Sequence, residues 1–367
     1  MDWRGEGMSL FSPSLHFRYL AKLYIKNLLA ILFGLSFAFA AIDYFQHVQQ
    51  LDVAGNYKIL YIFYMWQEAL GLLYPLAIVF ALIMTKLSLV KNNTMGALHA
   101  FGYNKKRLFL PLMAVATLTY AIFTFLHTTE FSYAKDKASF LLHNELHAYD
   151  VTDLFFKYND TFVYIKNLDP VKKKIEDITI FKVEGYQVRY TIHAPAAYFD
   201  GEEWDARDAT LKTHIYKNGE LEKYRVEHKK SIKTLNGYKP KIIESLYEGK
   251  ALNIVDAFNT WRLLEKQNLN SDKIRAVFYD KVIVPLFALA LLLILFFKLP
   301  FHARMMNFGT IIALSLGATF VIWGILFGLN QIGSNGVVAP EFTAILPIVL
   351  LWFYAIYVYV TDERSIV

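Results

Sequence analysis

Six runs of apolar residues, each long enough to cross a membrane, constrain this sequence more than any other feature. A transmembrane α-helix needs about 20 consecutive, mostly apolar residues. The runs span residues 19–42, 69–89, 108–126, 277–297, 308–329 and 342–360. Charged residues make up only 19% of the chain, against about 25% in soluble domains. Length and composition therefore both indicate a membrane protein.

The runs form two groups of three, separated by a long segment without a spanning run. They predict a membrane α-helical fold with six transmembrane helices, three plus three, and an inserted all-β, jellyroll-like domain. We expect residues 1–127 to hold an N-terminal cytoplasmic segment, three helices and a cytoplasmic loop at about 90–107. We expect residues 128–273 to form the inserted domain, and residues 274–367 the last three helices with a short cytoplasmic tail.

The inserted segment carries the signals of β-strands. Residues 153–158 and 161–166 alternate in polarity around Asn159-Asp160, which is typical of a hairpin turn. Further β-prone runs are separated by turn residues. They lie at residues 178–183, 187–193, 210–216 and 221–228. Many short strands with regular turns predict a sandwich or a jelly roll.

Lysine and arginine in the short loops predict the orientation, because cytoplasmic loops carry an excess of these residues. Those on one side of the predicted membrane are Arg4, Arg18, Lys22, Lys26, Lys86, Lys91, Lys105, Lys106, Arg107, Lys298, Arg304 and Arg364. The opposite short loops hold only Lys58. We therefore expect a multi-pass protein of the inner membrane, with both termini cytoplasmic and the inserted domain periplasmic.

Several chemistries are excluded by what the sequence lacks. There is no cysteine, so disulfides and thiolate metal sites are ruled out. The phosphate-binding pattern GxxxxGK[ST] does not occur, which excludes nucleotide hydrolysis by that route. The net charge of +6 is clustered by segment and gives no reason to expect a nucleic-acid partner. We expect no cofactor, no metal site and no catalytic residue.

Four short stretches carry a resemblance to a known family. Arg18-Tyr19-Leu20 opens the first apolar run, and Ala100-Phe101-Gly102-Tyr103 precedes a basic cluster. Residues 161–165 and 198–204 match an early strand and a later strand pair. The chain has three spans, an inserted domain and three further spans. From about residue 18, the order and spacing of the four stretches within this arrangement resemble the LptF/LptG family of lipopolysaccharide-export permeases. The hairpin sequence leans towards LptG.

The resemblance implies a transport function. Family members form a heterodimer with the paralogous LptF/LptG permease, on an LptB-like ATPase dimer, and work with LptC-like and LptA-like periplasmic proteins. Lipopolysaccharide enters their central cavity from the outer leaflet, and ATP-driven closure moves it into the jellyrolls and on to the periplasmic bridge. The chain would then be a transport subunit and no enzyme, with ATP hydrolysis in a partner chain.

The cytoplasmic loop is the best candidate for ATPase docking. Met95, Leu98 and His99 are spaced to share one helix face, and Gly102 would end that helix. Where the family commonly has a Glu, the chain has Thr94, so we expect a neutral, hydrogen-bonding contact. The alternative is an ordinary amphipathic helix lying on the membrane. The full candidate set is Asn93, Thr94, Met95, Leu98, His99, Ala100, Gly102 and Tyr103.

Lipid contact is predicted at two places. Lys135 and Lys137 fit the position where family members carry basic residues for phosphates, although they could also be a solvated charge run. Asp43 stands where some members have a cavity lysine, so the phosphate contacts have moved or come from the partner permease. Candidate acyl-chain contacts in the inserted domain are the aromatic residues Phe156, Tyr158, Phe162 and Tyr164.

A protein with a different class of function could have the same arrangement of spans and inserted domain. An inner-membrane structural or assembly factor, or a channel, could carry a periplasmic domain without an ATPase partner. Such a protein would give no reason for the basic, glycine-terminated cytoplasmic loop. Copurification with an ATPase separates the two hypotheses.

Overall fold

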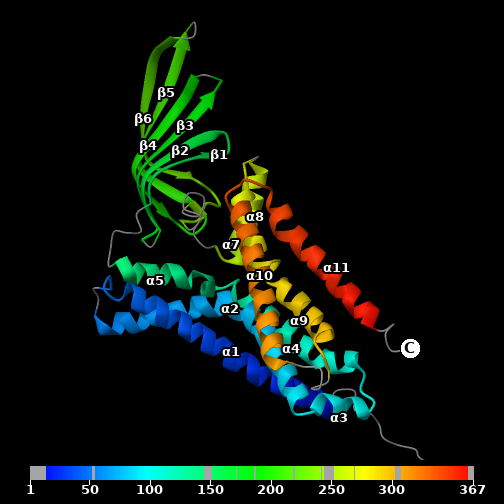
Figure 1. Ribbon diagram of the computed structural model, residues 1–367. Coiled ribbons are helices and arrows are strands. Elements are labelled where there is room, and N and C mark those ends of the chain that lie inside the picture. The colour runs from blue at the N-terminus through cyan, green and yellow to red at the C-terminus, as the bar shows by residue number, and fades with distance from the viewer. Residues whose placement is uncertain are drawn as a thin grey trace, which may run out of the picture.

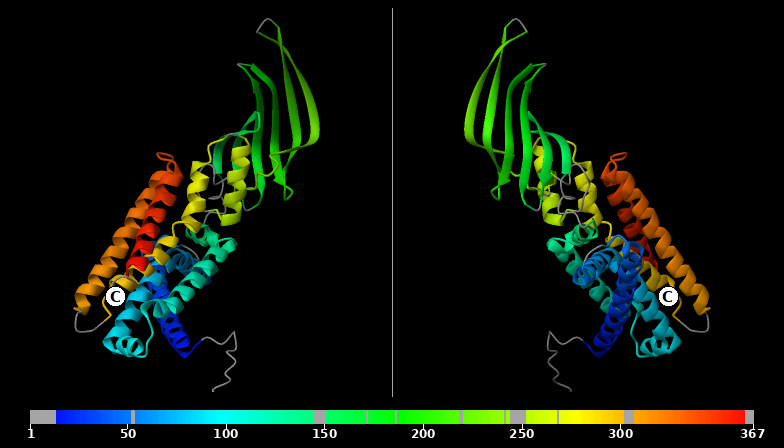
Figure 2. Two further views of the ribbon diagram at one scale, coloured as in Figure 1. Left: turned by 90° about the vertical axis from the view of Figure 1, so that its right-hand side faces the viewer. Right: turned by 90° about the vertical axis from the view of Figure 1, so that its left-hand side faces the viewer.

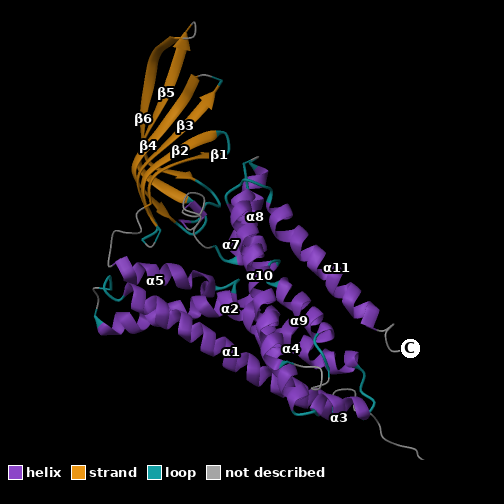
Figure 3. Cartoon of the chain, in the orientation of Figure 1, coloured by secondary structure: helices purple, strands orange, loops and turns teal. Residues whose placement is uncertain are grey.

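The computed structural model describes residues 14–51, 54–143, 151–170, 172–185, 187–217, 220–240, 242–243, 252–267, 269–301 and 307–362. A bundle of helices forms one part of the molecule, and a β-sheet projects from one end of it (Figures 1 and 3). Six helical segments in the described residues are long and apolar enough to span a membrane. The predicted fold class, a helical membrane protein with an inserted β domain, is confirmed.

The first group of spans contains three long helices. They are α1 (Leu15–His47), α2 (Gly55–Lys91) and α4 (Lys105–Leu126), and the short α3 (Thr94–Ala100) lies between the last two. The 37 residues of α2 correspond to about 55 Å, much more than the hydrocarbon thickness of about 30 Å. The helix therefore extends beyond the bilayer core, where α5 (Ala134–His143) packs along it.

The second group also contains three spans, and the fourth and sixth spans of the chain are irregular. The fourth span is α8 (Asp272–Val282) followed by α9 (Leu286–Lys298), and α10 (Phe308–Ser334) is the fifth. The sixth starts as a π-helical turn, η3 (Glu341–Ile345), and continues as α11 (Leu346–Thr361). Pro285 interrupts the fourth span, because proline has no N–H to donate to the preceding turn.

A single apolar core joins both groups of spans. Its centre is made by α2 and α9, whose side chains are mostly buried, while α1, α4, α10 and α11 surround them. Polar contacts also link α1 to α2. The Tyr24 hydroxyl donates to the Ile78 carbonyl over 2.8 Å, and the Asn27 amide donates to the Thr85 hydroxyl over 2.8 Å.

The inserted domain is a six-stranded antiparallel sheet in which each strand pairs with its neighbour in sequence. The strands are β1 (Val151–Tyr158), β2 (Thr161–Asp169), β3 (Lys174–Glu184), β4 (Gln187–Phe199), β5 (Trp204–Lys217) and β6 (Glu220–Thr234). The predicted β domain is thus present. Within the described residues its connections are consecutive hairpins in one sheet, whereas a jelly roll crosses between two sheets.

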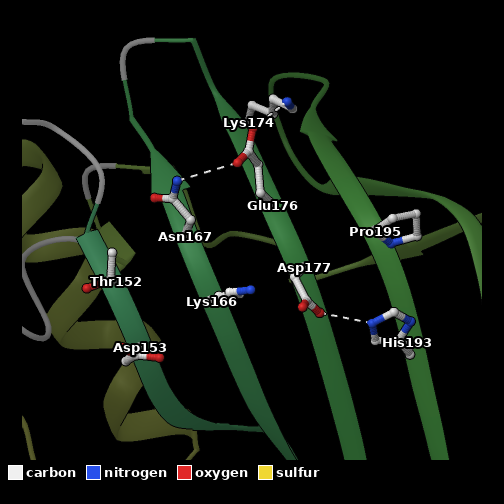
Figure 4. Close-up of a pocket in the computed structure, with 9 residues that line it drawn as sticks. All are labelled: Thr152, Asp153, Lys166, Asn167, Lys174, Glu176, Asp177, His193 and Pro195. Carbon is white, nitrogen blue, oxygen red and sulfur yellow. Dashed lines mark hydrogen bonds and ion pairs between the residues drawn. The ribbon is translucent and has the colours of Figure 1, made fainter. Parts of the chain in front are cut away.

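A crease crosses all six strands at one level. At this level one position in each neighbouring pair of strands, or two in the pair β4–β5, is skipped in the ladder, and the register is the same on either side. The skipped residues are Asp153, Lys166, Asp177, Pro195, Asp208 and Lys230. Figure 4 shows the first four side by side on adjacent strands, beneath a polar trough of about 600 Å³.

Three aspartates on alternate strands have the backbone conformation that makes the crease. The φ angles of Asp153, Asp177 and Asp208 are 56°, 58° and 52°. This left-handed region is uncommon for residues other than glycine, and Asp tolerates it better than most. Because of these positions, apolar residues that are three apart, such as Ile175 and Ile178, lie on the same face of the sheet. Aligned across the sheet, these positions form one line of unpaired residues.

The crease can be tested at Asp177. Substitution Asp177→Val places a β-branched residue at positive φ and should destabilise the β domain by about 1–3 kcal/mol. Asp177→Gly should be much milder, because glycine adopts positive φ freely. Thr179→Val, two residues further along β3, is the matched control in ordinary strand conformation. Thermal unfolding of the full chain measures all three. Equal losses of stability in the Asp177→Val and Asp177→Gly variants would contradict a backbone role for this position.

One face of the sheet, called the inner face here, is apolar and continues across the crease. Its buried residues are Leu154, Val163, Ile165, Leu168, Ile175, Ile178, Ile180, Ala194, Ala197, Trp204, Ala206 and Ala209. The chain after β6 covers part of this face with Leu235, Tyr238, Ile242 and Ile243. The indole N–H of Trp204 donates to the Tyr238 carbonyl over 2.6 Å, which anchors this segment.

The return helix α7 (Ile254–Lys266) ties the sheet to the bundle. The Ile254 amide donates to the His127 carbonyl over 3.0 Å. The Tyr133 hydroxyl donates to the Asp256 carboxylate over 2.8 Å. Burial and this carboxylate raise the pKa of the Tyr133 phenol, so it remains a donor at neutral pH.

Candidate functional site

The loop between α2 and α4 folds as the sequence predicts, into a short helix ended by glycine. Asn93, with φ 55°, precedes α3, and Gly102, with φ 84°, follows it. The Gly102 amide donates to the His99 carbonyl over 2.9 Å, and the Tyr103 amide to the Leu98 carbonyl over 3.2 Å. This is the hydrogen-bond pattern of a glycine-terminated helix.

Three of the predicted docking residues share one face of α3, and that face packs inward. Met95 is 1% exposed within the helical core, and Leu98 packs against the same core. The ring of His99 lies 6.0 Å from that of Phe301. Helical spacing indicates which residues share a face, but it does not show which neighbour covers that face. In the isolated chain Met95, Leu98 and His99 hold α3 to the bundle.

The outward face of the loop is made by the other residues. Asn93, Ala100 and Gly102 are exposed, and Thr94 is half-buried. The ring of Tyr103 packs against that of His16 at 4.2 Å, which links the loop to the start of α1.

Asp43 is held within its own chain. Its carboxylate accepts a hydrogen bond of 2.5 Å from the Tyr61 hydroxyl and lies 3.5 Å from Nδ1 of His47. Its side chain is 17% exposed. The contact with Tyr61 links α1 to α2, and the Asp43 carboxylate is thus held by partners in its own chain.

Lys135 and Lys137 lie on α5 but differ in their surroundings. The Lys137 ammonium is 3.2 Å from the carboxylate of Glu130. Lys135 is exposed and interacts electrostatically with Glu68 on α2. Lys135 is therefore the more available of the two for an anionic ligand.

The four aromatic candidates divide between the two faces of the sheet. Phe156 and Tyr158 pack on the inner face, with ring centroids 5.6 and 5.4 Å from that of Tyr238. The ring of Phe162 stacks on Phe155 on the opposite face, and the Tyr164 hydroxyl donates to Asp153 over 2.6 Å. The structure thus brings together two of the four on the apolar side.

Comparison with known proteins decides the family. Residues 18–361 match the family model described as lipopolysaccharide export system permease LptF/LptG. The chain belongs to this family. The match does not distinguish LptF from LptG, and a search of curated proteins returns no match.

Membership of the LptF/LptG family confirms part of the function expected from the sequence. With its six apolar helices, this permease is a multi-pass protein of the inner membrane that belongs to lipopolysaccharide export. It is a transport subunit by family.

The structure adds two residues of this LptF/LptG permease that sequence reasoning missed. Phe101 is 81% exposed directly after α3. Lys86 is buried, donates to the carbonyls of Phe296 and Leu299 at the end of α9, and lies 4.1 Å from the ring centroid of Phe301. An isolated lysine in an apolar run was a signal for a buried contact. Phe101 could not be singled out in the same way, because an aromatic residue before a glycine in a loop is too common to indicate a docking site.

Proposed function

We propose that this chain is the membrane subunit of an ATP-driven lipopolysaccharide exporter, with the ATPase in a separate, LptB-like partner. The observation that carries the proposal is the continuous connection between a helical bundle of this family and a creased sheet with one apolar face. The bundle provides the membrane part of the path, and the sheet provides an apolar surface beyond it.

The proposed orientation places α3 in the cytoplasm and the sheet in the periplasm. The two lie at opposite ends of the helical bundle (Figures 1 and 2). The basic residues of the loop between α2 and α4 lie at the α3 end, which the positive-inside rule assigns to the cytoplasm. Both termini are proposed to be cytoplasmic.

ATPase docking is proposed at the exposed side of the α3 loop. Ala97, Ala100 and Phe101 are exposed there, while Met95 and Leu98 hold α3 against the core. Lys86 supports this arrangement, because it joins α2 to the end of α9 beside Phe301, which His99 contacts. A movement of α3 would thereby reach two central helices of the bundle.

Acyl chains are proposed to follow the inner face of the sheet. Burying apolar surface is favourable, and the inner face carries apolar side chains on both sides of the crease, partly covered by the chain after β6. Phe156 and Tyr158 are half-buried and border it. An LptC-like and an LptA-like protein would continue this path, and a paralogous LptF/LptG permease would complete the cavity in the membrane.

Copurification tests the proposal directly. The full chain, extracted from its native membrane in mild detergent, should bring with it an ATPase and a second permease of this family. ATP hydrolysis by the complex should increase when lipopolysaccharide is added. A chain that purifies without an ATPase under conditions that retain its partners would favour a structural factor or a channel.

A double substitution tests the proposed phosphate contacts. Lys135→Ala with Lys137→Ala should weaken lipopolysaccharide-stimulated ATP hydrolysis about two- to fivefold, since exposed ion pairs contribute about 0–1 kcal/mol each. Lys135→Ala alone should reduce the stimulation more than Lys137→Ala alone, because the Lys137 ammonium is already near the Glu130 carboxylate. The defect should depend on salt. Lys157→Ala, an exposed lysine on β1, is the control. Unchanged stimulation at low salt would assign the phosphates to the partner permease.

A further inference from the structure

A polar cavity of about 170 Å³ lies where the fourth span is interrupted. Its walls come from α2, α8, α9, α10, the connection between α8 and α9, and the segment after α4. The charged residues that line it are Glu68, Asp280 and Lys281. None of them has a part in the proposed docking or lipid contacts. Ionisable residues at membrane depth are functional candidates by default.

The break in the fourth span leaves the carbonyls of Asp280 and Lys281 without the amide donor of a continuous helix, whereas the Val282 carbonyl accepts from the Tyr120 hydroxyl over 2.8 Å. α8 ends at Val282, and Pro285 cannot donate to the carbonyl of Lys281. The amides of Ile283 and Val284 both donate to the single carbonyl of Tyr279. The carboxyl end of a helix carries partial negative charge, and interrupted membrane helices use such ends to coordinate cations.

Two buried side chains lining the cavity have unmet hydrogen-bonding capacity. Asn330 is 7% exposed, and its amide donates to the Asp280 carboxylate over 2.8 Å, whereas its Oδ1 has no partner among the residues that the structure describes. Tyr74 is 1% exposed, and its hydroxyl has no hydrogen-bond partner within the described part of the chain. Buried polar atoms without partners are rare and point to a bound water or ion.

The charge of the described lining residues does not balance. Two carboxylates, Glu68 and Asp280, face one ammonium, that of Lys281, which interacts electrostatically with both. The Lys281 ammonium also lies 3.5 Å from the Ser132 hydroxyl. Burial lowers the pKa of His127 to about 4, so its ring is neutral. With Glu68 and Asp280 ionised, the lining carries one net negative charge.

The nearby charges outside the cavity do not remove this imbalance. Lys135 and Asp136 both interact with Glu68, and their charges are opposite. In the part of the chain that the structure describes, no basic nitrogen lies within 4 Å of the Asp280 carboxylate. That side chain also remains accessible.

We propose that this cavity binds one small monovalent cation, Na⁺ or K⁺, between the Asp280 carboxylate, Oδ1 of Asn330 and the end of α8. One such ion supplies the missing positive charge and a partner for the unmet acceptor. Its role is to hold the two halves of the fourth span and α10 together at the interruption. The inference goes beyond lipid export and does not depend on it.

Thermal unfolding in defined salts tests the cation site. The full chain in phosphatidylcholine nanodiscs is unfolded in NaCl, KCl or choline chloride at equal ionic strength. Ligands that bind only the folded state raise its stability with concentration, so Na⁺ or K⁺ should raise the midpoint saturably above that in choline. Equal midpoints in all three salts would overturn the proposal, and would indicate a protonated Asp280 or bound water.

Three substitutions locate the effect. Asp280→Asn should raise the half-effect concentration of the cation at least about tenfold, since a lost charge partner costs more than about 1.4 kcal/mol. Asn330→Asp should lower stability in choline, where two carboxylates repel, and should tighten cation binding. Glu130→Gln, an exposed acid outside the cavity, should respond like the wild type. A cation response that persists unchanged in both cavity variants would place the ion elsewhere.

Discussion

Substitution Phe101→Asp is expected to separate the ATPase from the permease. Phe101 is 81% exposed on the cytoplasmic side proposed here, and an exposed aromatic ring at a docking surface typically contributes about 2–4 kcal/mol to binding. Its loss, with a charge in its place, should weaken ATPase binding at least about thirtyfold. The amount of ATPase that copurifies with the full chain measures this effect.

Two further substitutions distinguish docking from folding. Phe101→Tyr keeps the ring and should retain the ATPase. Leu98→Asp places a charge against the helical core and should reduce the amount of folded chain, because Leu98 packs there. A Phe101→Asp complex that copurifies, hydrolyses ATP and exports lipopolysaccharide like the wild type would show that docking lies elsewhere.

The elements of this permease could be predicted because each has its own signal in the sequence. Membrane spans are recognised by length and polarity, and all six predicted runs lie within observed spans. Strands are recognised by alternation, and each predicted strand lies within an observed one. Gly102 ends α3 because a left-handed residue is needed there.

What could not be predicted depends on residues far apart in the sequence. The crease requires Asp153, Asp177 and Asp208 to lie at one level, which becomes visible only when the strands are in register. The face of each aromatic residue in the sheet depends on the same register. Phe156 and Phe162 both belong to alternating patterns, yet they lie on opposite faces.

The candidate site shows the same division between local and distant information. The helix α3 follows from the spacing of its residues, whereas the face that it turns inward depends on the core formed by α2 and α9. Asp43 is isolated in sequence and acquires its contacts with Tyr61 and His47 only in the folded chain. The lysine at position 86 acquires its partners from the end of α9, more than two hundred residues away.

The central claim is that lipopolysaccharide leaves the membrane along the inner face of the creased sheet. The most direct test places a photo-reactive phenylalanine analogue at Phe156 or Tyr158, which border the inner face. Phe162 and Tyr164 on the same hairpin, facing the opposite side, are matched controls. In the assembled complex, lipopolysaccharide should crosslink at the two inner positions, only with ATP, and not at the two controls. Equal labelling on both faces, or labelling that is independent of ATP, would contradict this path.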